Sequence, residues 1–237
     1  MPQGKLILFP VTIGGDLPLS LPVANLGLLD SCKVFIVEEV RTARRFLKSA
    51  GYSHPIDGTE FLELNEHTDP RTIGHYLDPL AHGENIGLLS EAGLPCIADP
   101  GAAVTQLAQR RGYEVVPLVG PSSLLLTLMA SGLNGQNFAF VGYLPVDRLK
   151  REKAIRMLES RMLKERQTQL FIEAPYRNNQ LMQSLVSTCA GETVICVGCD
   201  LMLPTQFIKS QRAADWSRSM PDLHKRNTVF AIGEFAN

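Results

Sequence analysis

The chain has 237 residues, of which 45% are hydrophobic and 20% charged, and its formal net charge is -1. This length suits one large domain or two small ones, and this hydrophobic content suits a folded protein with a full core. The near-neutral balance excludes an overall positive field that would attract nucleic acid, so any basic surface must be local.

The first half of the chain alternates strand and helix patterns. Apolar runs predict strands at 5–11, 34–37, 86–89 and 115–118, and apolar periodicity predicts helices at 23–30, 41–50, 69–81, 102–111 and 121–131. In the predicted helix at 69–81, Asp69 is the expected cap and Pro70 the first helical residue. Regular alternation of this kind indicates a parallel sheet.

The second half has a different pattern. Strands are predicted at 138–143, 169–173, 194–199, 206–209 and 228–232, and helices at 147–164 and 178–189. The last three strands follow one another with little helix between them, which indicates a mixed sheet. We therefore expect two α/β domains, 1–118 and 119–237.

Neither a membrane segment nor a metal site is expected. No run approaches the roughly 18 apolar residues of a membrane helix, and the N terminus lacks the apolar core of a signal peptide, which favours a cytoplasmic protein. Cys196 and Cys199 form a lone Cys-x-x-Cys, but in a strand residues three apart face opposite sides. With no second pair and no closely spaced histidines, buried structural cysteines are favoured over a metal centre.

Two apolar runs, 86–89 and 115–118, end abruptly in glycine, proline, serine and acidic residues. In open α/β sheets, ligands bind in the crevice outside the carboxyl ends of the strands. Here the crevice would be lined by backbone amides, small hydroxyls and one or two acids. Such a site suits a polar small molecule that brings its own reactivity.

Four segments resemble motifs of a known family. They are Ser-Glu-Ala-Gly-Leu-Pro at 90–95 with Ala-Asp-Pro-Gly at 98–101, Val-Gly-Pro-Ser-Ser at 119–123, Phe-Ala-Phe-Val-Gly-Tyr-Leu-Pro at 138–145, and Ile-Glu-Ala-Pro-Tyr-Arg at 172–177. In order and spacing they are similar to the tetrapyrrole methylase superfamily of S-adenosylmethionine-dependent methyltransferases. Within it, the chain most resembles the enzymes that methylate ribose 2′-hydroxyls of small-subunit ribosomal RNA.

The resemblance implies a donor cleft between a parallel-sheet N-terminal domain and a mixed-sheet C-terminal domain, a homodimer, and ribosomal RNA or the small ribosomal subunit as partner. Gly93 and Gly120 would let the backbone approach the donor, while Ser122 and Ser123 would offer hydroxyls and helix-start amides, or simply cap a helix. The donor-binding residues expected from the resemblance are Pro10, Ser90, Glu91, Ala92, Gly93, Ile97, Gly120, Ser122, Ser123, Tyr143 and Ala174.

Transfer to a ribose hydroxyl requires a proton acceptor. The candidates at predicted strand ends are Glu38, Glu39 and Glu173, of which Glu39 and Glu173 are favoured. Tyr176 and Arg177 would stack on a base and hold a phosphate. Arg41 and Arg44 are further expected substrate contacts, although solvated surface roles are the alternative for all four.

The chain departs from the resemblance at 199–203, where the family's Arg-Glu-Leu-Thr-Lys becomes Cys-Asp-Leu-Met-Leu and both cations are lost. Three hypotheses therefore stand: an RNA ribose methyltransferase, which leads; a methylase of a tetrapyrrole or another small acceptor; and a diverged paralogue that binds donor or RNA without transfer. The predicted helix at 147–164 is the most basic region, and it is either a solvated face or an RNA track.

Overall fold

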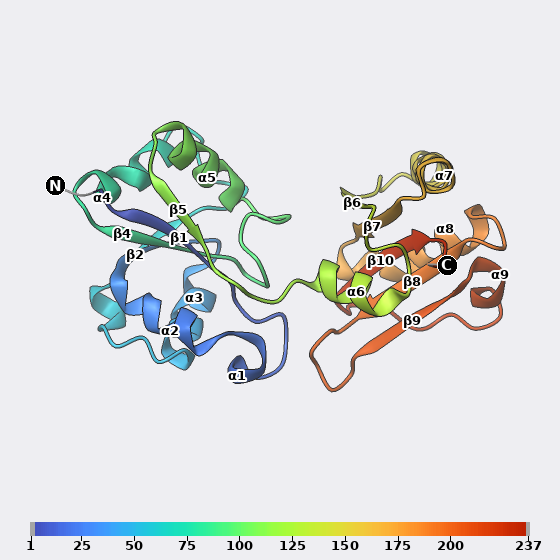
Figure 1. Cartoon of the computed structure of the whole chain (residues 1–237), viewed down its shortest axis with the longest axis horizontal. Coiled ribbons are helices and arrows are strands. Elements are labelled where there is room, and N and C mark those ends of the chain that lie inside the picture. Colours follow the sequence, from blue (N-terminus) through green and yellow to red (C-terminus); the bar gives the residue numbers. More distant parts are fainter. Residues whose placement is uncertain (1–2, 236–237) are drawn as a thin grey trace. The chain divides into compact units, whose positions relative to one another are not determined.

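The computed structural model describes residues 3–235, which form two compact units with the boundary between Ser122 and Ser123. The predicted boundary lies shortly before it, after Leu118. Each unit has a five-stranded sheet with helices packed on it (Figure 1). The expected α/β class, with one parallel and one mixed sheet, is confirmed.

The first unit contains a wholly parallel sheet in the order β3-β2-β4-β1-β5. Its strands are β1 (Lys5–Phe9), β2 (Cys32–Val37), β3 (Glu60–Glu63), β4 (Asn85–Leu89) and β5 (Glu114–Pro117). Its helices are α1 (Leu17–Ser20), α2 (Val23–Leu28), α3 (Val40–Ser49), α4 (Asp78–Ala81) and α5 (Gly101–Arg110). β1, β2 and β4 are almost continuously buried because hydrophobic clusters cover both faces of the sheet.

Two features of this unit differ from the sequence prediction. The predicted helix at 69–81 is wrong: the Asp69 carboxylate accepts from the amide and the guanidinium of Arg71, which closes a turn, and only a 3-10 segment (Ile73–Leu77) and α4 follow. β3 was missed because it is a short edge strand with a glutamate at each end.

The second unit contains the mixed sheet, in the order β6-β7-β10-β8-β9, in which only β6 and β7 are parallel. Its strands are β6 (Phe138–Tyr143), β7 (Thr168–Ile172), β8 (Val194–Cys199), β9 (Phe207–Arg212) and β10 (Thr228–Gly233). Its helices are α6 (Ser123–Ser131), α7 (Arg148–Glu165), α8 (Asn178–Thr188) and α9 (Ala213–Trp216).

The cysteine prediction is confirmed in β8. Cys196 and Cys199 are both fully buried, and they belong to two different hydrophobic clusters. All five cysteines are free thiols, and burial raises the pKa of Cys189 to about 12 and that of Cys32 to about 11. Residues 3–235 contain no group of three or more metal-ligating side chains, and none of their helices has the length and apolar character to cross a membrane.

Candidate functional site

Predicted site residues of the first unit follow four parallel strands, so they lie at one edge of its sheet. Pro10 follows β1, Glu39 is the N-cap of α3 soon after β2, Ser90 follows β4, and Gly120 lies just beyond β5. Because the carboxyl ends of parallel strands share an edge, the fold gathers segments that are far apart in the sequence.

The loop after β4 has an unusual backbone. Gly93 has a φ of 74°, and the non-glycine residues Cys96 and Ala98 also have positive φ values, 69° and 56°. Such residues cost energy and cluster where a loop is shaped for a ligand. A Cβ on Gly93 would lie 3.0 Å from Cγ2 of Ile13 and 3.2 Å from the Pro121 carbonyl oxygen, so space is tight at a position whose positive φ already favours glycine.

Internal hydrogen bonds hold this loop in place. The Gly93 carbonyl accepts from the amide of Val11 at 2.9 Å and from the hydroxyl of Ser90 at 3.0 Å. The buried Ser90 hydroxyl therefore shapes the loop rather than pointing into solvent. Ala92 and Ile97, predicted to contact the donor, lie exposed on the same loop.

A hollow of about 600 Å³ lies beside this edge. It is lined by the loop after β1, by one side of α3 and by the end of β4 with its following loop. Thr12, Arg45, Ser90 and Glu91 give it polar walls, while Leu17 and Phe46 add apolar surface. The first unit thus has a cavity of ligand size next to the predicted donor loop.

The acidic residues at this edge have different environments. Glu39 caps α3: its carboxylate accepts from the hydroxyl and amide of Thr42 and from the amide of Arg41, and these bonds lower its pKa, the Thr42 hydroxyl most strongly. The neighbouring Glu38 is partly buried, and this burial raises the pKa of its carboxyl group. The negative charges of the nearby Asp99 and Glu91 raise the same pKa further. The bonded carboxylate of Glu39 argues against its predicted role as proton acceptor.

Asp99 closes the donor loop onto α5. Its Oδ1 accepts from the amides of Cys96 at 3.2 Å and Gly101 at 2.7 Å. Burial of this carboxylate raises its pKa, and the two amide bonds oppose that rise. Asp99 therefore fixes the entry to α5 from one residue before the N-cap position, which is Pro100.

In the second unit, the predicted residues gather where β6 and β7 end. Tyr143 ends β6, and Glu173 and Ala174 follow β7, so the parallel pairing of these strands puts them at one edge. The Glu173 carboxylate is buried, and its Oε1 accepts from the Ala174 amide at 2.7 Å and from Nη2 of Arg177 at 2.6 Å. Within the described structure its Oε2 is buried with no partner.

Tyr176 and Arg177 form a preassembled pair. Arg177 Nη1 donates to the Tyr176 hydroxyl at 2.6 Å, and the guanidinium carbon lies 4.8 Å from the tyrosine ring centroid. Glu173 raises the pKa of the Arg177 guanidinium. Arg177 is thus engaged on two sides, while its Nε has no partner within the described structure, and its role of holding a phosphate stays a prediction. Tyr176 is 58% exposed.

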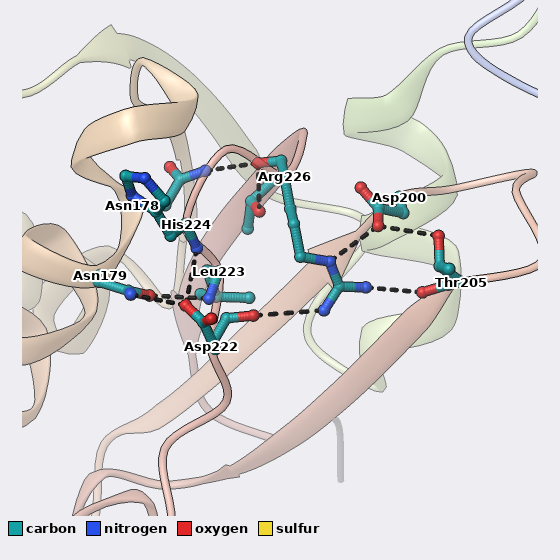
Figure 2. A network of polar contacts seen from close by, with 9 residues as sticks. Asn178, Asn179, Asp200, Thr205, Asp222, Leu223, His224 and Arg226 are labelled. Carbon is teal, nitrogen blue, oxygen red and sulfur yellow. Dashed lines mark hydrogen bonds and ion pairs between the residues drawn. The ribbon is translucent and has the colours of Figure 1, made fainter.

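A polar network, which the sequence did not predict, braces this segment (Figure 2). The Pro175 carbonyl accepts from the Lys225 amide at 2.9 Å, and Nδ2 of the buried Asn178 donates to the Arg226 carbonyl at 2.6 Å. The Arg226 guanidinium in turn donates to Oδ2 of Asp200 at 2.8 Å and to the Thr205 carbonyl at 2.7 Å.

This network reaches the segment in which the two family cations are missing. Asp200 and Met202 both have positive φ values, 49° and 67°, and Arg226 ties the loop they form to the neighbouring one. A cation from another segment therefore neutralises the acid at 200. No signal in the sequence marked Arg226, because its partner is 26 residues away.

Comparisons with known proteins decide the family. A scan against protein-family models finds no match. The chain is 32% identical over 236 residues to ribosomal RNA small subunit methyltransferase I of Leptospira borgpetersenii, which covers 98% of this chain and 88% of that protein. The chain belongs to this methyltransferase family.

Other comparisons agree with the assignment. The protein of the same name from Bacillus subtilis is 32% identical over 200 residues, covering 84% of this chain and 64% of that protein. Among solved structures, the methyltransferase CobJ and the cobalt precorrin-4 methyltransferase CbiF each match with a TM-score of 0.63 at 15% identity, covering 99% and 97% of this chain and 95% and 94% of theirs. These two likenesses show the fold, and the curated relatives confirm the prediction of a methyltransferase.

The structure thus gathers the predicted residues into two sets, one in each unit. Pro10, Gly120 and the 90–97 loop share the strand edge of the first, and Tyr143, Ala174 and Tyr176 that of the second. Ser122 and Ser123 lie at the boundary, with Ser123 as the first residue of α6. Arg41 and Arg44 are exposed on α3, where Arg44 lies over the Phe61 ring. The donor cleft between the domains stays a prediction.

Proposed function

We propose that this chain transfers the methyl group of S-adenosylmethionine to a ribose 2′-hydroxyl of small-subunit ribosomal RNA. Family membership and the shape of the loop after β4 support the proposal. The relatives from Leptospira and Bacillus carry a name that specifies small-subunit ribosomal RNA. The departures at 199–203 concern the acceptor rather than the donor, so donor binding and transfer are tested separately.

The residues present fit the proposed donor. A Cβ on Gly93 or Gly120 would meet neighbouring protein atoms, so glycine at these positions lets the strand-end loops pack closely and fixes the backbone that is proposed to face the donor. When bound, the sulfonium of S-adenosylmethionine supplies an already electrophilic methyl group. The protein then has mainly to orient donor and acceptor at close range.

Glu91 and Tyr143 are proposed to complete the contacts to the donor. Glu91 lines the 600 Å³ hollow, and its partial burial raises its pKa. Its carboxylate suits a hydrogen bond from a hydroxyl or amino group of the donor. Tyr143 is 60% exposed at the end of β6 and offers an aromatic face and a hydroxyl.

Two carboxylates remain as proton acceptors for the ribose hydroxyl, because Glu39 is held by the start of α3. Glu173 has one buried oxygen without a partner within the described structure, although Arg177 holds the other. Glu38 has a raised pKa, which moves it toward the operating pH of a general base. We expect Glu38→Gln or Glu173→Gln, but not Glu39→Gln, to lower the methyl-transfer rate by ~10²-fold or more with unchanged donor affinity.

The experiment is labelled-methyl transfer to small ribosomal subunits that lack the family's modification, run beside calorimetry with the donor alone. Transfer to the subunit RNA supports the proposal. Donor binding without transfer to any RNA would favour the non-catalytic paralogue, and transfer only to a tetrapyrrole would favour the small-acceptor methylase. Absence of donor binding would defeat every methyltransferase hypothesis.

A cytoplasmic location and a homodimer belong to the same proposal. The location follows from a ribosomal RNA substrate, and the dimer rests on the family resemblance. Sedimentation of the purified chain tests the dimer directly, and a monomer at micromolar concentration would contradict this part of the proposal.

A further inference from the structure

The outer face of α7 carries a stripe of cations that have no acidic partner among residues 3–235. The buried face of the helix holds Arg151, Ile155, Leu158 and Met162. On the opposite side, at helical spacing, lie Lys153, Arg156, Ser160 and Lys164. Lys153, Arg156 and Lys164 are exposed, and no carboxylate among the described residues pairs with any of them.

The carboxylates of the helix bond to groups other than these three cations. Glu159 accepts from the Ala190 amide and the Thr193 hydroxyl, which hold it against the body of the unit. Glu152 pairs with Arg148 at 2.9 Å and Glu165 with Arg161 at 3.7 Å, both on the flanks of the helix. The centre of the outer face is therefore positive, although the helix as a whole mixes both signs.

Large apolar side chains lie among these cations. Leu149 is 75% exposed, Met157 64% and Leu163 55%, all on the same side of the helix as the lysines. A helix that lies in a membrane interface separates its apolar stripe from its cations. Here the two kinds alternate within one stripe, which favours a ligand with both phosphates and apolar base or sugar surfaces, as in RNA.

The helix runs along the unit from the candidate site. Four residues separate its start from Tyr143, and two separate its end from β7, so it leaves the edge that carries Tyr143 and Ala174 and ends at the opposite edge. Its 18 residues span roughly 27 Å. Arg166, the residue after the helix, is also exposed; its φ is 52°, and its carbonyl accepts from Nδ2 of Asn134 at 2.8 Å.

We propose that the outer face of α7, from Lys153 to Lys164, binds the phosphate backbone of the RNA that carries the acceptor ribose. The inference rests on the proposed function and adds to it the surface that holds the substrate beyond the site of transfer. It explains how a chain with a net charge of -1 binds RNA, because the binding charge is concentrated on one helix face.

The test compares two charge-matched double variants in binding to undermethylated small-subunit RNA over a range of salt. Lys153→Gln with Arg156→Gln removes two cations of the stripe. Lys33→Gln with Arg110→Gln removes one lysine and one arginine that are exposed on the other unit. We expect the α7 variant, but not the control, to bind more weakly and to lose ~2 from the slope of log affinity against log salt.

Calorimetry with S-adenosylmethionine on both variants separates a loss of RNA binding from a loss of donor binding. Equal RNA affinity and salt slope in the two variants, with the wild type active on RNA, would overturn the α7 surface and leave the proposed function standing. A wild type that binds donor but no RNA would overturn both. If instead the α7 variant loses binding to anionic phospholipid vesicles or changes its oligomeric state, with RNA binding intact, the surface serves another partner and the inference is wrong.

Discussion

Gly120 and Pro10 approach each other so closely that a Cβ on Gly120 would collide with Cβ and Cγ of Pro10. The two residues follow adjacent parallel strands, β5 and β1, and both are predicted donor contacts. Asn25 fixes the same turn by donating to the Val119 carbonyl at 2.6 Å. Close backbone packing thus shapes the strand edge at which we expect the methyl donor.

Gly120→Ala tests this packing. The added methyl group must push Pro10 away, so we expect a loss of about 1–3 kcal/mol in the free energy of unfolding and weaker donor binding. Gly27→Ala is the matched control, because a Cβ at Gly27 in α2 meets nothing within 4 Å. It should stabilise the protein by up to about 1 kcal/mol. Urea titration measures both, and equal stability of the two variants would show that Gly120 is not confined.

Asp99→Asn tests the raised pKa of the buried loop carboxylate. The asparagine Oδ1 can keep both amide bonds while the cost of burying a charge disappears. Because the folded-state pKa of Asp99 is raised, its proton is bound more tightly in the native state, and wild-type stability falls as the pH rises through that pKa. The variant should therefore be more stable than wild type at pH 7, and this gain should vanish in acid.

Asp69→Asn is the control of opposite sign. The pKa of Asp69 is lowered, mainly by the Arg71 side chain, so its contribution is present at neutral pH and is lost as the pH falls through the folded-state pKa. This variant should be less stable than wild type at pH 7. Chemical denaturation from pH 3 to 8 follows both, and a pH-independent difference for Asp99→Asn would contradict the assignment.

Arg226→Met tests the bracing of the 174–178 segment. Removal of the guanidinium takes away the ion pair to Asp200, whose Oδ2 keeps the Thr205 hydroxyl, and removes the bond to the Thr205 carbonyl, so we expect a loss on the order of 1–3 kcal/mol in stability. If Arg226 positions the segment, the variant also lowers the transfer rate, and Arg226→Lys restores part of it. A loss of stability with an unchanged rate at saturating substrate would limit Arg226 to a purely structural role.

Ser123→Tyr tests the predicted donor contact at the start of α6. A bulky ring at this position should abolish donor binding while thermal unfolding stays cooperative. Met129→Tyr, on the exposed side of the same helix, is the control and should bind donor normally. Equal affinity of the two variants for S-adenosylmethionine would place Ser123 outside the site.

The sequence pattern predicted most of the sheets because their strands are apolar and end in strong turn signals. Ile86 to Leu89 reads as a buried parallel strand, and that is its place in β4. The pattern failed where local chemistry competed with periodicity. Asp69 has the pattern of a helix cap, yet its carboxylate closes a turn with Arg71. The strand β3 was not predicted because its two apolar residues lie between two glutamates.

At the site, the sequence located the segments but not the state of each side chain. From the sequence, Glu39 and Glu173 are equally good candidate bases, because both follow predicted strands. Only the structure shows that Glu39 is held by Thr42 and Arg41, and that Arg177 is turned onto Glu173 and Tyr176. These hydrogen bonds depend on side-chain rotamers and on residues that are distant in the sequence, as in the bond from Arg226 to Asp200.

Calorimetric titration of the purified chain with S-adenosylmethionine tests the central claim most directly. We predict saturable binding with one donor per chain, lost in Ser123→Tyr and retained in Met129→Tyr. No detectable heat at millimolar donor, from a chain that unfolds cooperatively, would contradict the account.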